Sequence, residues 1–203
     1  MLDSATKCFD QYIKYFEQNE FGLALAQVER FFWHDFCDNY LELIKNQIFN
    51  PEQYDAQQVA ATRQTLYSIG LRILQMFAPY MPHITENLYT LIYKKQVQIT
   101  SLHQTKFAQI QTAHHFEQSA ADTDALIKVV GAIRKLKSEQ QLSLKTPIAI
   151  LTVHASTKEL TDALKAQDQI IRGVAQAIEV HYVTGEFNEP TIADVNGAWH
   201  AQV

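Results

Sequence analysis

The chain has 203 residues, of which 47% are hydrophobic and 19% charged, and its formal net charge is −5. This balance is typical of a globular protein with a proper core, and it argues against disorder and against a surface that grips nucleic acid everywhere. A local basic patch remains compatible with it, because a few Lys and Arg suffice for phosphate contacts. The two cysteines, Cys8 and Cys37, lie far apart inside helical patterns. This usage is typical of reduced thiols and predicts a cytosolic protein.

Helical patterns dominate the first 145 residues. An amphipathic segment over 4–18 follows the N-cap candidate Ser4, and a longer one over 19–49 ends before Pro51 in the turn 50–55. The longer segment has an apolar repeat with a widened edge: Leu25, Val28, Phe32, Phe36, Tyr40 and Leu43, joined by Trp33, Cys37 and Ile44. Further helices are predicted over 55–78, over 82–95 with Ile84, Leu88 and Leu91 buried, and over 118–140.

The pattern changes after residue 145. Two β-branched segments, 146–155 and 177–184, are predicted strands, and two short helical patterns, 156–166 and 168–176, lie between them. The expected fold class is mainly α: an antiparallel helical bundle with a small C-terminal βαβ-like α/β unit. The expected domains are a helical bundle over 1–145, a small α/β subdomain over 146–185, and a tail over 186–203 that adds at most a short strand. A long loop is expected over 96–115.

The sequence contains no recognisable catalytic or metal centre. His114 and His115 are adjacent and lack ligands at suitable spacing, while His154 and His181 lie on the two predicted strands without a third ligand. No glycine-rich phosphate loop, nucleophile elbow or paired-cysteine motif is present. The predicted catalytic and metal-binding residues are therefore none.

One segment is locally basic. Residues 128–145 contain Lys128, Arg134, Lys135, Lys137 and Lys145, against the single acid Glu139. Lys128, Gly131 and Lys135 recur at i, i+3 and i+7, which places them on one stripe of the predicted helix. The stripe is either a phosphate-binding surface or an ordinary solvated face, and the spacing does not decide between them.

The aromatic segment 31–45 mixes rings with charges. Its rings are interpreted as core, and the polar side chains of the same predicted helix (19–49), including Arg30 and His34, lie on the opposite side. Because base stacking needs an exposed ring, only a ring at the border of the apolar stripe, such as Phe31 or Trp33, could contact RNA.

Three blocks of the chain resemble one family. "FWHDFCDNYLELIK" (32–45), "LRILQMFAPYMPHITENLY" (71–89) and "VVGAIRKLKSEQQLSLKTPI" (129–148) resemble successive blocks of valyl-tRNA synthetases, in the same order. The resemblance implies the C-terminal anticodon-binding domain of a class I aminoacyl-tRNA synthetase. Such enzymes use ATP and Mg²⁺, and the His-Ile-Gly-His and Lys-Met-Ser-Lys-Ser signatures of their catalytic domain do not occur here. Asn39 stands where many members have Trp.

What the resemblance implies is recognition of the anticodon stem-loop of valine tRNA, with the catalytic domain of the same polypeptide as a second partner and no membrane partner. The RNA-binding candidates are Arg30, His34, Asn39 and Arg63, with Lys128, Arg134, Lys135 and Lys137 as phosphate contacts. The alternative is a helical protein-interaction module whose basic stripe docks an acidic partner.

Overall fold

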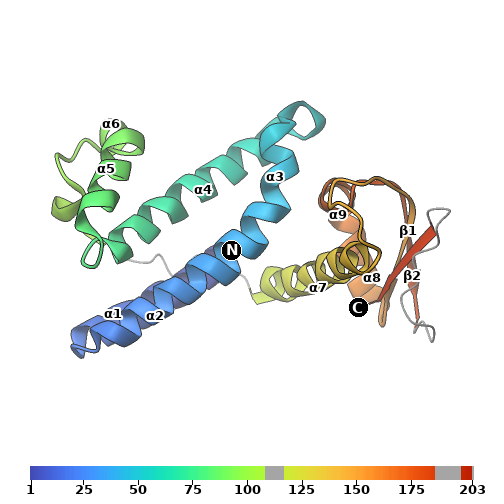
Figure 1. Cartoon of the computed structure of the whole chain (residues 1–203), viewed down its shortest axis with the longest axis horizontal. Coiled ribbons are helices and arrows are strands. Elements are labelled where there is room, and N and C mark those ends of the chain that lie inside the picture. The colour runs from blue at the N-terminus through green and yellow to red at the C-terminus, as the bar shows by residue number, and fades with distance from the viewer. Residues whose placement is uncertain (108–116, 186–197, 203) are drawn as a thin grey trace. The chain divides into compact units, whose positions relative to one another are not determined.

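The computed structural model describes residues 1–107, 117–185 and 198–202 (Figure 1). The chain divides into two compact units: Met1–Leu41 with Tyr54–Phe116, and Glu42–Gln53 with Glu117–Val203. Unit 1 is helical, and unit 2 combines helices with a small parallel sheet. The predicted fold class, mainly α with a small βαβ-like part, is confirmed. None of the described helices is both long enough and apolar enough to cross a membrane.

Unit 1 begins with two helices that pack side by side, α1 (Leu2–Glu17) and α2 (Phe21–Arg30). The chain continues from α2 into a π-helix (Phe31–Leu41). The other elements of unit 1 are α4 (Ala56–Phe77), α5 (Pro82–Ile92), α6 (Lys94–Val97) and a 3₁₀ turn (Leu102–Gln104). Asp55 starts α4 because its carboxylate accepts hydrogen bonds from the backbone N–H groups of Gln57 and Gln58.

The core of unit 1 joins α1, α2, the π-helix and α4. Its fully buried members include Phe9, Tyr12, Phe31 and Ile69. The Tyr12 hydroxyl donates a 2.8 Å hydrogen bond to the Met76 carbonyl oxygen, which ties α1 to α4. Both the rings and this buried polar bond fix how the helices of unit 1 pack.

The π-helix alters which aromatic side chains face this core. Its hydrogen bonds run from residue i to i+5, so each turn takes in more residues than an α-helical turn. The ring series Phe32, Phe36 and Tyr40 follows it at i+4 intervals, with successive ring centroids 6.2 Å and 6.0 Å apart. Phe31 is 1% exposed, whereas Trp33 is 58% exposed. The prediction that Trp33 widens the buried stripe is wrong, because a uniform α-helical repeat does not hold across this segment.

Helix α5 also buries a different face from the one predicted. Thr85 and Tyr89 are buried, while Ile84 and Leu91 are exposed. The Thr85 hydroxyl donates to the Met81 carbonyl oxygen at 2.8 Å, and the Tyr89 hydroxyl donates to that of Ile99 at 2.9 Å. The large ring of Tyr89 fills the small core of this region, and its hydroxyl is satisfied there, so this face is buried in preference to the aliphatic one.

Unit 2 contains α3 (Glu42–Phe49), a 3₁₀ turn (Pro51–Gln53), α7 (Glu117–Glu139), α8 (Lys158–Ala166) and α9 (Asp168–Ala175). Its strands are β1 (Ile148–Ala155), β2 (Ala177–Thr184) and β3 (Ala198–Gln202). The sheet order is β2-β1-β3 and both pairings are parallel. In the register, Leu151 of β1 lies opposite Val180 of β2 and Trp199 of β3.

The core of unit 2 explains why the observed division differs from the predicted boundary at residue 145. Leu43 of α3 and Val129 and Ile133 of α7 pack in one cluster with Leu151 of β1 and Ile171 of α9. Because α3 and α7 bury their apolar stripes against this α/β layer, they belong to it and not to the preceding bundle. The predicted βαβ unit is confirmed, and the tail does supply a short strand. The remainder of the tail and residues 108–116, including His114 and His115, lie outside the described residues.

A pH dependence follows from the buried phenols of unit 1. Burial is the main cause that raises the pKa of Tyr12 above its ordinary value of 10.0. The folded state therefore keeps this proton at a pH where the unfolded chain loses it. Its contribution to stability is fully present below pH 10 and falls by up to about 1.4 kcal/mol per pH unit above it. We expect Tyr12→Phe to make the decline in urea-unfolding free energy between pH 9 and pH 11 less steep. Parallel curves for the two proteins would contradict this.

Candidate nucleic-acid interface

The first group of candidate RNA-binding residues lies on one continuous helical segment of unit 1. Arg30 ends α2 and is exposed, and His34 follows on the π-helix, also exposed. The His34 Nδ1 atom lies 3.7 Å from Asp38 Oδ2. Asn39 is half-buried, and its side-chain amide donates a 2.7 Å hydrogen bond to the His34 carbonyl oxygen. Arg30 and His34 therefore present their side chains to solvent, while part of the Asn39 amide is used within the helix.

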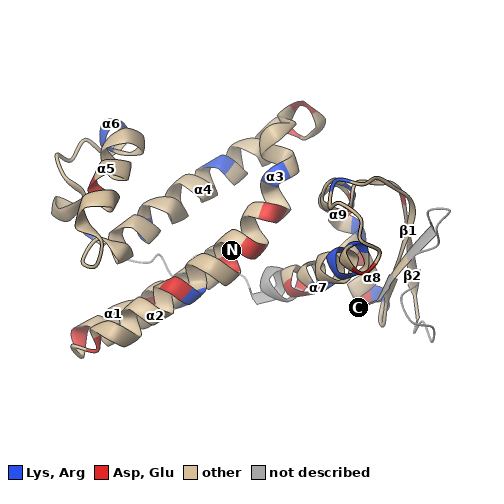
Figure 2. Ribbon diagram, in the orientation of Figure 1, with Lys and Arg blue, Asp and Glu red and all other residues tan. Residues whose placement is uncertain are grey.

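Helix α4 carries two positive charges and no negative ones. Its charged residues are Arg63 and Arg72, and it contains no Asp or Glu (Figure 2). Arg63 is exposed. An exposed guanidinium without an acid on its own helix suits phosphate contact, because its donors are not already committed to a nearby carboxylate.

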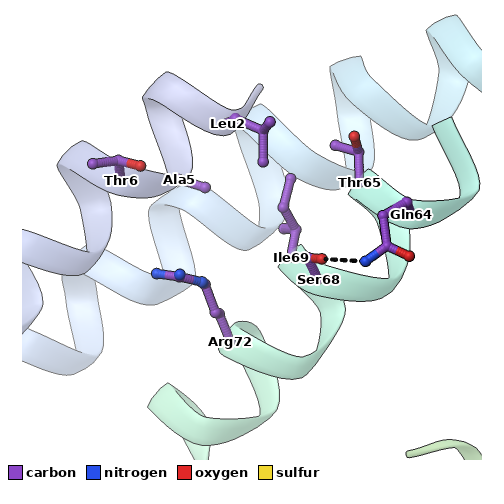
Figure 3. Close-up of a pocket in the computed structure, with 8 residues that line it drawn as sticks. All are labelled: Leu2, Ala5, Thr6, Gln64, Thr65, Ser68, Ile69 and Arg72. Carbon is purple, nitrogen blue, oxygen red and sulfur yellow. Dashed lines mark hydrogen bonds between the residues drawn. The ribbon is translucent and has the colours of Figure 1, made fainter. Parts of the chain in front are cut away.

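Arg72 stands in a pocket of about 290 Å³ between α1 and α4 (Figure 3). Its guanidinium carbon lies 5.1 Å from the centroid of the Phe9 ring, and burial lowers the pKa of Arg72 despite the opposing charge of Asp10. The other lining residues are uncharged: Leu2, Ala5, Thr6, Gln64, Thr65, Ser68 and Ile69. With one cation and no general base or carboxylate in its lining, the pocket lacks the groups that bond-forming chemistry needs.

The second group of candidates lies on α7 in unit 2. Lys128 is exposed and makes no hydrogen bond or ion pair with other residues of the described ranges. Lys135 Nζ lies 3.9 Å from Glu139 Oε1, and a half-buried Arg134 Nη2 lies 3.7 Å from Glu42 Oε2. Lys128 and Lys135 thus remain on the exposed stripe predicted from their spacing. The exposed Lys135–Glu139 ion pair is weak enough to be exchanged for a contact with a phosphate.

Lys137 does not belong to that surface, and the prediction that it contacts phosphate is wrong. Its side chain is 1% exposed. The ammonium donates to the carbonyl oxygens of Leu144, Thr146 and Ala175 at 2.9, 2.7 and 2.8 Å. All three of its donors are therefore used inside unit 2. The sequence did contain a signal: Lys137 follows the inward residue Ile133 by four positions, so it lies on the buried face of α7.

Nucleophiles and metal ligands are not assembled in the described residues. No group of three or more His, Cys, Asp or Glu side chains there could hold a metal ion. His154 approaches His200 of β3, with Nε2 and Nδ1 3.0 Å apart, and not His181, which pairs with Glu179. Burial, with a smaller contribution from His200, lowers the pKa of His154. Burial raises the pKa of the Cys8 thiol to about 12, which leaves it protonated and unreactive.

Sequence reasoning underestimated one residue of this region. The apolar repeat predicts Trp33 at the widened edge of the buried stripe, whereas in the folded π-helix its ring is exposed, on the same helical segment as Arg30 and His34. The sequence allows a short strand in the tail but does not indicate which strand it pairs with, so the His154–His200 contact follows only from the observed pairing of β1 with β3.

Comparison with known proteins identifies the class. Residues 1–153 match the family model of the anticodon-binding domain of tRNA ligase. This match covers most of the chain, including all of unit 1 that the structure describes. The chain therefore belongs to the anticodon-binding domain family of tRNA ligases.

Several relatives of the chain are valine–tRNA ligases. The chain is similar to the valine–tRNA ligase of Rickettsia conorii, with 36% identity over 148 residues, which cover 72% of this chain and 18% of the relative. It is also similar to the valine–tRNA ligases of Rickettsia rickettsii strain Sheila Smith (35% identity, 72% and 18%) and Rickettsia akari (32%, 81% and 20%). The chain thus spans about a fifth of the length of these relatives.

Proposed function

We propose that this chain recognises the anticodon stem-loop of valine tRNA as part of a valine–tRNA ligase. The observation that carries this proposal is the match of residues 1–153 to an anticodon-binding domain, together with relatives that are valine–tRNA ligases. The exposed Lys128 and Lys135 of α7, together with the exposed Arg30 and His34 of the α2 and π-helix segment, agree with it.

The mechanism is binding, without a bond-forming step in the described residues. In unit 1, Arg30, His34, Asn39 and Arg63 are the proposed contacts, of which the amide of Asn39 and the imidazole of His34 suit base edges. In unit 2, Lys128, Arg134 and Lys135 would contact phosphates, which fix the position of the RNA without reading its sequence. Lys137 is excluded, because its ammonium is buried and saturated.

The remaining chemistry belongs to the rest of such a ligase. ATP and Mg²⁺ would be used by a catalytic domain of the same polypeptide, which we propose as the second partner of this chain. Two free thiols, one buried and one half-buried, support a reducing compartment such as the cytoplasm.

The α7 stripe is tested by removing two charges. We expect the double variant Lys128→Ala, Lys135→Ala to weaken tRNA binding about tenfold near 0.1 M salt. The magnitude of the slope of log K against log salt should fall by about 1 to 2, because each phosphate contact that is lost removes the counterion release that accompanied it. The measurement is filter binding or fluorescence anisotropy over a salt series.

The matched control removes two exposed lysines elsewhere in unit 2, Lys158→Ala with Lys165→Ala. The net charge change is identical, so an equal loss in both double variants would show a general charge effect and contradict a specific stripe. Truncating the tRNA to remove its anticodon stem-loop should abolish specific binding. If affinity is indifferent to that loop, the proposal fails and the acidic-protein partner becomes the better explanation.

A further inference from the structure

We infer that Trp33 is a stacking platform for one unpaired nucleobase of the bound RNA. This inference rests on the proposed function and assigns a contact within it. The occupant is the flat face of a base, and neither a phosphate nor an apolar protein surface.

The ring of Trp33 is both accessible and held in place. Although it is 58% exposed, its ring meets that of Phe32 edge-on at 5.0 Å between centroids. Phe32 in turn packs edge-on against Phe77 of α4 at 5.7 Å and stacks with Phe36 at 6.2 Å. Because core rings support this exposed indole, it loses little conformational entropy when a base stacks on it. Ordering a mobile side chain for the same contact would cost more.

The location of Trp33 also favours a binding role. It lies near the start of an 11-residue π-helix, and π-helical turns are rare and occur frequently at functional sites. Phe31, two residues earlier, is fully buried in the same core. The π-helix therefore buries the ring of Phe31 in the core and leaves the ring of Trp33 exposed to solvent.

The exposed charged side chains of the helical segment that carries Trp33 favour a base over a phosphate. Arg30 and His34 are exposed on this segment, but so are Glu29 and Asp38. The two carboxylates would repel a phosphate, whereas carboxylates accept hydrogen bonds from exocyclic amino groups of bases. A guanidinium beside a stacked base adds cation–π attraction. A purely apolar protein partner would leave these four polar groups facing an apolar surface, at a desolvation cost.

Substitution of the ring distinguishes stacking from apolar packing. We expect Trp33→Leu, which keeps an apolar side chain and removes the aromatic face, to weaken binding of the anticodon stem-loop RNA about tenfold or more. Trp33→Phe should retain binding within about threefold. Because stacking on an indole involves no phosphate contact, Trp33→Leu should leave the slope of log K against log salt unchanged, in contrast to Lys128→Ala with Lys135→Ala. Phe49→Leu, which alters an exposed ring of unit 2, is the matched control and should bind as the unsubstituted chain does.

Fluorescence gives an independent readout. The chain has two tryptophans, so Trp199→Phe leaves Trp33 as the sole reporter. Saturable quenching of that emission by the stem-loop RNA is expected. If the unsubstituted chain does not bind this RNA, the proposed function itself fails. If the unsubstituted chain binds this RNA but Trp33→Leu lowers the affinity no more than Phe49→Leu does, stacking on Trp33 is refuted and the proposed function stands. Equal affinity loss with Trp33→Leu and Trp33→Phe would also refute it, because phenylalanine can stack.

Discussion

Lys137→Ala is expected to lower the free energy of unfolding of unit 2 by about 3 kcal/mol. The substitution leaves the carbonyl oxygens of Leu144, Thr146 and Ala175 without their shared donor, and an unsatisfied buried acceptor costs about 1–3 kcal/mol. It also leaves a void where the aliphatic stem was packed. The ammonium joins the end of α7, the turn that follows it and the end of α9, so its loss loosens three segments together.

The test is urea unfolding, with amide hydrogen exchange to localise the effect. Lys135→Ala is the matched control, because it removes the same side chain two residues away, where it is 78% exposed. We expect a change within about 0.5 kcal/mol for that variant. Lys137→Met retains the stem and should recover part of the loss. Equal stability of Lys137→Ala and Lys135→Ala would show that the three hydrogen bonds are not formed in solution.

Phe31→Ala is expected to destabilise unit 1 by about 3–5 kcal/mol, which is the usual cost of deleting a buried aromatic ring. Phe31 is fully buried in a cluster that also contains Phe9, Tyr12 and Met76, drawn from α1 and α4. Removing it opens a cavity that helices held by other contacts can close only in part.

The neighbouring ring provides the contrast. Trp33→Ala should change the unfolding free energy by much less, because most of its ring is already in solvent. Thermal unfolding of both variants, together with stem-loop binding, separates the two duties: Phe31→Ala should lose stability, and Trp33→Ala should lose RNA affinity. If both variants lose stability equally, Trp33 packs in solution, and its exposed position in the structure is wrong.

The sequence by itself determined the local elements of this protein. Apolar side chains at helical spacing predicted α4 and α7 to within a few residues, and β-branched runs predicted β1 and β2, because these periodicities depend only on backbone geometry. Pro51 and Pro82 marked a helix end and a helix start through their missing N–H and fixed φ. The three family blocks also predicted the anticodon-binding class from residue identity alone.

Only the tertiary structure decided what a buried polar side chain meets and, in the aromatic segment, which of two similar neighbours is buried. Lys135 and Lys137 have the same chemistry, yet one is in solvent and the other donates to three carbonyl oxygens, one of which comes from α9, 38 positions along the chain. Phe31 and Trp33 are equally aromatic, and the π-helix turns one into the core and the other outward. The grouping of α3 and α7 with the sheet was likewise invisible locally. Burial is a property of surfaces that meet from distant parts of the chain, and a local repeat does not specify which surfaces meet.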